Sequence, residues 1–279
     1  MNQVPVGSHA FAALALGAVL GILLPLLVAL LWVRRKKEPF KTVIVGALIF
    51  FVFVTILEKP IQALVITGGH PVAESLSVNP IWWAFVVGLF PGVFEETGRL
   101  FAFKTILKKR KNRETAVSYG IGHGGMEVMM LMGVNGIAYL VYAAMINSGT
   151  FSAVVEQAAA RAPDQAETLY TLAEQLANYT IAGVGMGMME RVFAFLFHIG
   201  ASIFVFYACR DKGRFWLYPL AVVLHTALDF IAALTIKNVI TISTLALEGI
   251  VGVFAILVFC GAYFLLYRKD TAFVNQTIG

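Results

Sequence analysis

Long apolar runs separated by short charged segments are the feature that most limits what this chain can fold into. About seven such runs follow one another along the 279 residues, and a helix needs ~20 consecutive apolar residues to cross a bilayer. A composition that is 59% apolar and only 13% charged does not describe a soluble domain. The sequence therefore predicts an all-α, polytopic integral membrane bundle with about seven transmembrane helices.

The apolar runs also set the expected boundaries of the spans. The spans are expected at about residues 10–33, 43–63, 81–107, 115–146, 180–208, 215–235 and 240–267. The one long polar stretch, residues 147–178, is expected to form an outer loop with one or two surface helices, because Ala-Pro-Asp at 162–164 reads as a stop followed by a fresh N-cap. Little length is left for a separate soluble domain, so residues 1–279 are expected to form a single membrane domain.

Basic residues predict the orientation of the chain. They cluster at residues 34–41, 108–113, 210–214 and 268–269. With seven spans, all four clusters lie on the same side of the membrane. By the positive-inside rule these ends are cytoplasmic. The formal charge of +5 therefore reports topology, and no nucleic-acid partner is expected. We expect a multi-pass protein of the cell membrane, embedded in the lipid bilayer, with the N-terminus outside and the C-terminus in the cytoplasm.

Two spans and one loop carry further local signals. Glycines between Gly120 and Gly136 in the fourth span indicate bending, close helix contacts or a heavily tilted helix. The second span is expected to end outside near Glu58. Residues 67–80, rich in Gly, Ser and Pro, are expected to form an outer loop in which His70 is solvated.

Ionisable residues on four of the expected spans lie at a common depth. Counted at 1.5 Å per residue from the nearest basic cluster, they lie roughly 15–22 Å into a hydrocarbon core about 30 Å thick. They are Glu95, Glu96, His123, Glu127, His198, His225 and Asp229, and Arg99 lies one turn after Glu95, nearer to the basic edge. Because charged groups at the bilayer centre cost at least ~2.5–3.5 kcal/mol, a shared depth indicates a functional site that faces the bundle interior.

Helical spacing pairs these residues, since side chains four apart lie on one face. The expected pairs are Glu95 with Arg99, His123 with Glu127, and His225 with Asp229. The arginine is expected to neutralise and orient a carboxylate, and each acid to fix the tautomer of the histidine on its own helix. Glu95 shares the face of Arg99 and is expected to contact water. Glu96 lies about 100° further around the helix and is expected to support Glu95.

The ordered motifs resemble those of a known superfamily. Glu95-Glu96-x-x-Arg99, His123-x-x-x-Glu127, Phe195-x-x-His198 and His225-x-x-x-Asp229 are similar to the motif series of the intramembrane peptidases that include the CAAX prenyl endopeptidases and the bacterial protease PrsW. The sequence around the glutamate pair and around His123 most resembles the bacterial YhfC family of intramembrane metalloproteases. Two residues separate the glutamate pair from the arginine, as in PrsW, whereas the CAAX enzymes have three.

The resemblance implies an endopeptidase that hydrolyses peptide bonds of membrane-associated peptide or protein substrates. By analogy with the CAAX enzymes, Glu95 assisted by His123 would activate a water molecule. His225 and Asp229 would stabilise the oxyanion. The implied catalytic set is Glu95, Glu96, Arg99, His123, His225 and Asp229, with Glu127 and His198 as support of the site.

The family description implies a bound metal such as zinc instead. The candidate ligands are His123, Glu127, His198 and His225, together with a carboxylate from Glu95 or Glu96. Neutral histidine and carboxylate side chains serve both a metal and a glutamate-activated water, so both chemistries stay open.

Two other functional classes use the same residues. In a proton-coupled transporter or channel, the glutamates and histidines would form a proton relay. Transporters commonly show two related halves with interrupted spans at matching positions, and no such halves are visible in the sequence. A non-catalytic membrane scaffold descended from a peptidase is the third class, and retention of the whole motif series argues against it.

The charge asymmetry predicts that a reporter fused after Lys269 lies in the cytoplasm. A dual fluorescent protein and alkaline phosphatase fusion at this point is expected to fluoresce and to lack phosphatase activity. The matched control is the same fusion within residues 147–178, which is expected to be active as a phosphatase. A fusion after Lys269 that is accessible from outside would overturn the orientation.

Overall fold

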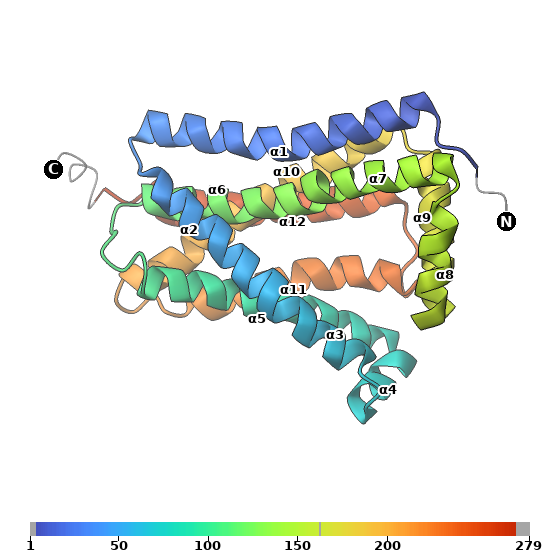
Figure 1. Cartoon of the computed structure of the whole chain (residues 1–279). Coiled ribbons are helices and arrows are strands. Elements are labelled where there is room, and N and C mark those ends of the chain that lie inside the picture. Colours follow the sequence, from blue (N-terminus) through green and yellow to red (C-terminus); the bar gives the residue numbers. More distant parts are fainter. Residues whose placement is uncertain (1–3, 162, 272–279) are drawn as a thin grey trace. The chain divides into compact units, whose positions relative to one another are not determined.

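The computed structural model describes residues 4–161 and 163–271, and all regular structure in these residues is helical (Figure 1). Six helical stretches in this part of the chain are long and apolar enough to cross a membrane. A seventh is added if α4 (Pro71–Val78) and α5 (Pro80–Lys104), which meet at a bend of 118°, count as one span. The prediction of an all-α, polytopic membrane bundle is confirmed.

The candidate spans are continuous helices, three of which include a π-helical stretch. They are α1 (Ser8–Lys36); α2 (Phe40–Phe50) with η1 (Phe51–Glu58) and α3 (Lys59–Thr67); α6 (Glu114–Val128) with η2 (Met129–Val134) and α7 (Asn135–Ser148); α10 (Ile181–Arg210); α11 (Leu217–Ile236); and α12 (Thr244–Ala262) with η3 (Tyr263–Tyr267). Even α11, with 20 residues, reaches about 30 Å at 1.5 Å per residue, which matches the hydrocarbon core.

The chain divides into two compact units. Within the described residues, unit 1 comprises 4–24, 128–161 and 163–191, and unit 2 comprises 25–127 and 192–271. Compactness alone does not make either unit an independent domain. The expected single membrane domain therefore stays a prediction.

Unit 1 contains the polar stretch of the sequence. Here α8 (Phe151–Arg161) and α9 (Pro163–Ala177) pack side by side and against α7 (Figure 1). Phe151 and Leu176 are buried in the core of this unit. Two helices thus form where the sequence predicts one or two. The break is expected at residues 162–164, of which Ala162 lies outside the described residues, and α9 begins at Pro163.

Unit 2 is organised around α5 and α11, which make the most extensive contact between two elements in the described part of the chain. Small residues allow this approach: a side chain at Gly88 would meet the backbone nitrogen of Phe230 at 2.7 Å, and one at Gly92 would meet the carbonyl oxygen of Val222 at 2.9 Å. The continuous helix α2–η1–α3 crosses α5 in the same unit (Figure 1). These contacts fix the helix that carries the glutamate pair.

Helices α2 and α6 also approach until their backbones touch. A Cβ atom at Gly122 would overlap the carbonyl group of Val43, and one at Gly46 would lie 2.9 Å from the backbone nitrogen of His123. Of the alternatives predicted for the glycine-rich fourth span, close helix contact is present at Gly122. The contact places the backbone of His123 directly against α2.

The structure corrects the sequence analysis between residues 58 and 80. Pro60 lies in the first turn of α3, where proline is tolerated, so the helix continues past it to Thr67. Glu58, which was expected at the outer end of its span, is consequently fully buried within the helix. Most of the expected loop is helix α4, and Nδ1 of His70 caps it by accepting a hydrogen bond from the backbone N–H of Ala73 at 3.3 Å.

Replacement of Gly122 by alanine is expected to destabilise the protein by ~1–3 kcal/mol, because the added methyl group forces α2 and α6 apart. The measurement is the thermal unfolding midpoint of the detergent-purified protein. Gly185→Ala in α10 is the matched control, since no atom lies within 4 Å of the added Cβ, and it is expected to leave the midpoint unchanged or slightly raised. A Gly122→Ala protein as stable as the wild type would contradict the close contact.

Candidate active site

Four helices of unit 2 bring together Arg99 and all the ionisable residues that the sequence places at one depth. Helix α5 carries Glu95, Glu96 and Arg99; α6 carries His123 and Glu127; α10 carries His198; and α11 carries His225 and Asp229. Glu127 and Asp229 are partly exposed, and the other six are buried. An unbroken series of contacts joins all eight, although their roles stay predictions.

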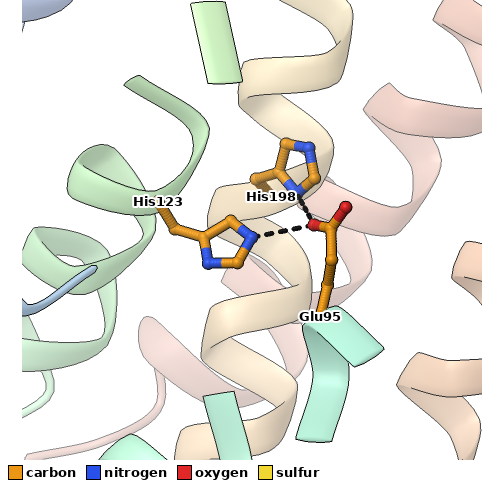
Figure 2. Close-up of side chains that lie close together, drawn as sticks. All are labelled: Glu95, His123 and His198. Carbon is orange, nitrogen blue, oxygen red and sulfur yellow. Dashed lines mark hydrogen bonds and ion pairs between the residues drawn. The ribbon is translucent and has the colours of Figure 1, made fainter. Parts of the chain in front are cut away.

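Glu95 and His123 form the closest contact between α5 and α6 in this group (Figure 2). Oε2 of Glu95 lies 2.8 Å from Nε2 of His123 and 3.8 Å from Nδ1 of His198. The imidazole of His123 is held edge-on by the ring of Phe50, with 5.0 Å between the ring centroids. Figure 2 shows the second carboxylate oxygen of Glu95, Oε1, on the side away from both histidines. Within the described residues Oε1 has no hydrogen-bond partner, so it is free to accept a proton.

Arg99 is fully buried, and all three of its guanidinium nitrogens are engaged. Nη1 donates to Oε1 of Glu96 at 2.7 Å, Nε donates to Oγ of Ser202 at 3.3 Å, and Nη2 donates to Nδ1 of His198 at 2.6 Å. Glu95 is more distant, with 3.8 Å between its Oε2 and Nη2 of Arg99. The arginine therefore pairs with a carboxylate as predicted, but Glu96 is its nearer partner.

His225 lies between two carboxylates. Its Nδ1 is 2.8 Å from Oε1 of Glu96, and its Nε2 is 3.5 Å from Oδ2 of Asp229. The ring of Phe197 packs against it at 4.9 Å between centroids. The side chain of Asp229 is 35% exposed, so this pair lies at the open edge of the group. The predicted pairing of His225 with Asp229 is present.

Glu127, which is predicted to pair with His123, has a close contact that helical spacing does not predict. It contacts Nε2 of His198 on the neighbouring helix. Gly124 permits this arrangement, because a Cβ at that position would already lie 3.1 Å from Cβ of His198. Helical spacing identifies neighbours on one helix, but a residue at a helix interface finds closer partners across it.

The geometry of one subset fits a metal ion. Among the described residues, a ligand atom of Glu95, one of His123 and one of His198 lie within 4.8 Å of one another. Two histidines and one carboxylate with an open fourth position form a known type of catalytic zinc site. Of the candidate ligands predicted from sequence, His123, His198 and the Glu95 carboxylate belong to this group, whereas Glu127 and His225 lie outside it.

The charge balance of the wider group supports the same fit. Nδ1 of His123 and Oε2 of Glu96 are buried without a hydrogen-bond partner in the part of the chain that the structure describes, but Glu96 is outside the subset and His123 faces Glu95 with Nε2. Four carboxylates share the group with a single arginine, which leaves an excess of acidic groups in a low-dielectric region. The donor set thus favours an added cation.

The sequence analysis missed two residues of this region. Ser202 lies one turn after His198, where its Oγ donates to the carbonyl oxygen of His198 at 2.7 Å and accepts from Arg99. Glu58 is completely buried on η1 and close enough for the charges of Glu95 and His225 to act on it. A glutamate within an apolar run was the available signal for Glu58, whereas a lone serine in a span carries none.

Loss of the Glu96 carboxylate is expected to destabilise the fold by about 3–5 kcal/mol, because it leaves the buried charge of Arg99 without its closest acid. The measurement is the thermal unfolding midpoint of the Glu96→Ala protein. In Glu96→Ala/Arg99→Met the unpaired charge is absent, so part of the loss should return. Glu190→Gln is the control, since Glu190 is paired with Arg191 and 43% exposed. Equal midpoints for the two single variants would contradict this account.

Comparison with known proteins gives two matches. The family model described as "YhfC intramembrane metalloprotease" matches residues 20–251. A curated relative from Bacillus subtilis (strain 168), described as "Uncharacterized membrane protein YhfC", is 30% identical over 252 residues, which cover 90% of this chain and 95% of the relative. No solved structure matches the chain significantly. The matched region includes all eight residues of the buried group.

Proposed function

Because the chain belongs to the YhfC intramembrane metalloprotease family, we propose that it is an intramembrane endopeptidase acting on membrane-associated peptide or protein substrates. The observation that carries the proposal is the contact of 2.8 Å between Glu95 and His123 inside a helical bundle. A carboxylate oriented by a histidine, with one oxygen left for water, is the arrangement that general base catalysis needs.

Glu95 is the proposed base. Its Oε2 is held by Nε2 of His123, while Oε1 accepts a proton from the attacking water. The water oxygen then bonds to the peptide carbonyl carbon, and the carbon–nitrogen bond breaks. Glu95 returns the proton to the departing amine, so one residue serves as base and then as acid.

His225 is the proposed stabiliser of the charge that develops on the carbonyl oxygen. Nδ1–H of His225 donates to Oε1 of Glu96 at 2.8 Å, so the ring must be doubly protonated for Nε2, which lies toward the partly exposed Asp229, to offer a second N–H. An N–H group fixed in advance toward a developing oxyanion stabilises the transition state without reorganisation. Glu96 and Asp229 act by orienting this ring.

The metal implied by the family name has a place in the same group. Glu95, His123 and His198 would hold it, and zinc there would act as a Lewis acid toward the substrate carbonyl. Oε2 of Glu95 faces the two histidines, so Oε1 keeps its role toward water (Figure 2).

Glu95→Gln is expected to abolish cleavage, because the amide preserves the shape and removes the base. The expected loss is roughly a thousandfold or more if Glu95 and His123 act as a unit. The measurement is mass-spectrometric detection of cleavage products from a membrane proteome mixed with purified protein in proteoliposomes. His123→Ala and His225→Ala are expected to lose nearly as much activity.

Glu190→Gln is the matched control, because the same chemical change falls on a residue outside the buried group. It is expected to retain measurable cleavage, and all variants must insert and unfold like the wild type. Full cleavage by Glu95→Gln would contradict the proposed base. Proton-coupled flux that depends on Glu95, without cleavage by the wild type, would support a transporter instead.

A further inference from the structure

Arg99 determines where His198 carries its proton. A guanidinium offers only hydrogen-bond donors and keeps its charge in proteins. Nδ1 of His198, 2.6 Å from Nη2 of Arg99, must therefore accept with its lone pair. A neutral histidine that accepts through Nδ1 carries its proton on Nε2, which faces Glu127. Both ring nitrogens of His198 are thus engaged with protein groups.

Nδ1 is also the nitrogen of His198 that faces the other metal-binding candidates. It lies 3.8 Å from Oε2 of Glu95, whereas Nε2 is directed toward Glu127. One lone pair cannot accept a hydrogen bond from Arg99 and bind a metal ion at the same time. Nη2 of Arg99 is also only 3.8 Å from Oε2 of Glu95, so its fixed charge repels a divalent cation there.

We propose that Arg99 competes with the metal ion for His198, so that the group of Glu95, His123 and His198 binds metal only when Nη2 of Arg99 leaves Nδ1. The inference rests on the proposed function in one respect, namely that this group holds a metal ion. It adds a regulatory property: the metal affinity of the site is set by how firmly Arg99 is held.

The exchange changes a single hydrogen bond. Arg99 keeps Glu96 at 2.7 Å and Ser202 at 3.3 Å when Nη2 is released. His198 needs no change of tautomer, because its Nδ1 lone pair passes from arginine to metal while its Nε2–H stays directed at Glu127. A carboxylate that receives the second N–H of a metal-bound histidine is the usual outer arrangement. The contacts that the exchange leaves in place therefore suit the metal-bound state.

The direction in which a substitution of Arg99 changes the metal affinity shows whether Arg99 competes with the metal ion or supports the site. If Arg99 merely supported the site, changing it would weaken metal binding by roughly 10- to 100-fold. If it competes, changing it strengthens metal binding. A hydrogen bond to a charged donor corresponds to an increase in affinity of about 10- to 100-fold.

The test is a zinc titration of the detergent-purified full chain against a chromogenic chelator, without substrate. Arg99→Lys keeps a positive charge beside Glu96 but loses the planar fork that also reaches His198. Its zinc affinity is expected to exceed that of the wild type by about tenfold or more. His123→Ala in the Arg99→Lys background is expected to remove the gained binding, which places the zinc in this group.

Glu96→Gln/Arg99→Met provides a second variant, which removes the donor to Nδ1 of His198 without leaving the Glu96 carboxylate unpaired. It is expected to tighten zinc binding to a similar extent, and it decides the question alone if Arg99→Lys does not fold. Unchanged or weaker affinity, or no zinc bound to any variant, overturns the inference. Tighter binding without cleavage by the wild type retains the inference and contradicts the peptidase. Cleavage without zinc binding supports the peptidase and contradicts the inference.

Discussion

The rest of unit 2 depends on the hydrogen bonds that satisfy one fully buried arginine. Arg99 cannot lose its proton, and an unpaired charge in a bilayer costs at least ~2.5–3.5 kcal/mol on insertion scales. Glu96, His198 and Ser202 satisfy its three nitrogens. Glu96 also contacts His225 on α11, and His198 also contacts Glu127 on α6. One cation thus links four helices through a connected polar network.

The same network joins stability and function. Close backbone contacts at Gly122 and Gly92 hold α6 and α11 against their neighbours, so His123 and His225 project from rigid elements. Rigid support is what allows a carboxylate and two histidines to meet at a defined geometry. The contact that satisfies Arg99 also occupies the nitrogen of His198 that a metal would use. Stability of the metal-free bundle and affinity for metal are therefore opposed at this residue.

Much of the fold and the membership of the site follow from the sequence, for physical reasons that also explain the errors. Basic clusters mark one membrane edge, so counting from them identifies residues at the same depth on different helices. Counting does not say which helices are neighbours, and for this reason the Glu127 to His198 contact and the role of Ser202 were missed. The glycine pattern predicted close approach in the fourth span but not that Val43 on α2 is the partner. Glu58 was expected near the outer end of its span, but the helix continues past it to Thr67.

The buried group is proposed to direct water onto a peptide bond. Cleavage in water enriched in oxygen-18 tests this proposal most directly, with the purified wild-type protein in proteoliposomes and mass spectrometry of the fragments. One labelled oxygen is expected in the new carboxyl terminus of the N-terminal fragment in the first turnover, and none in the C-terminal fragment or in uncleaved substrate. N-terminal fragments without label, or the absence of any fragment from protein that is folded and inserted, would contradict this mechanism.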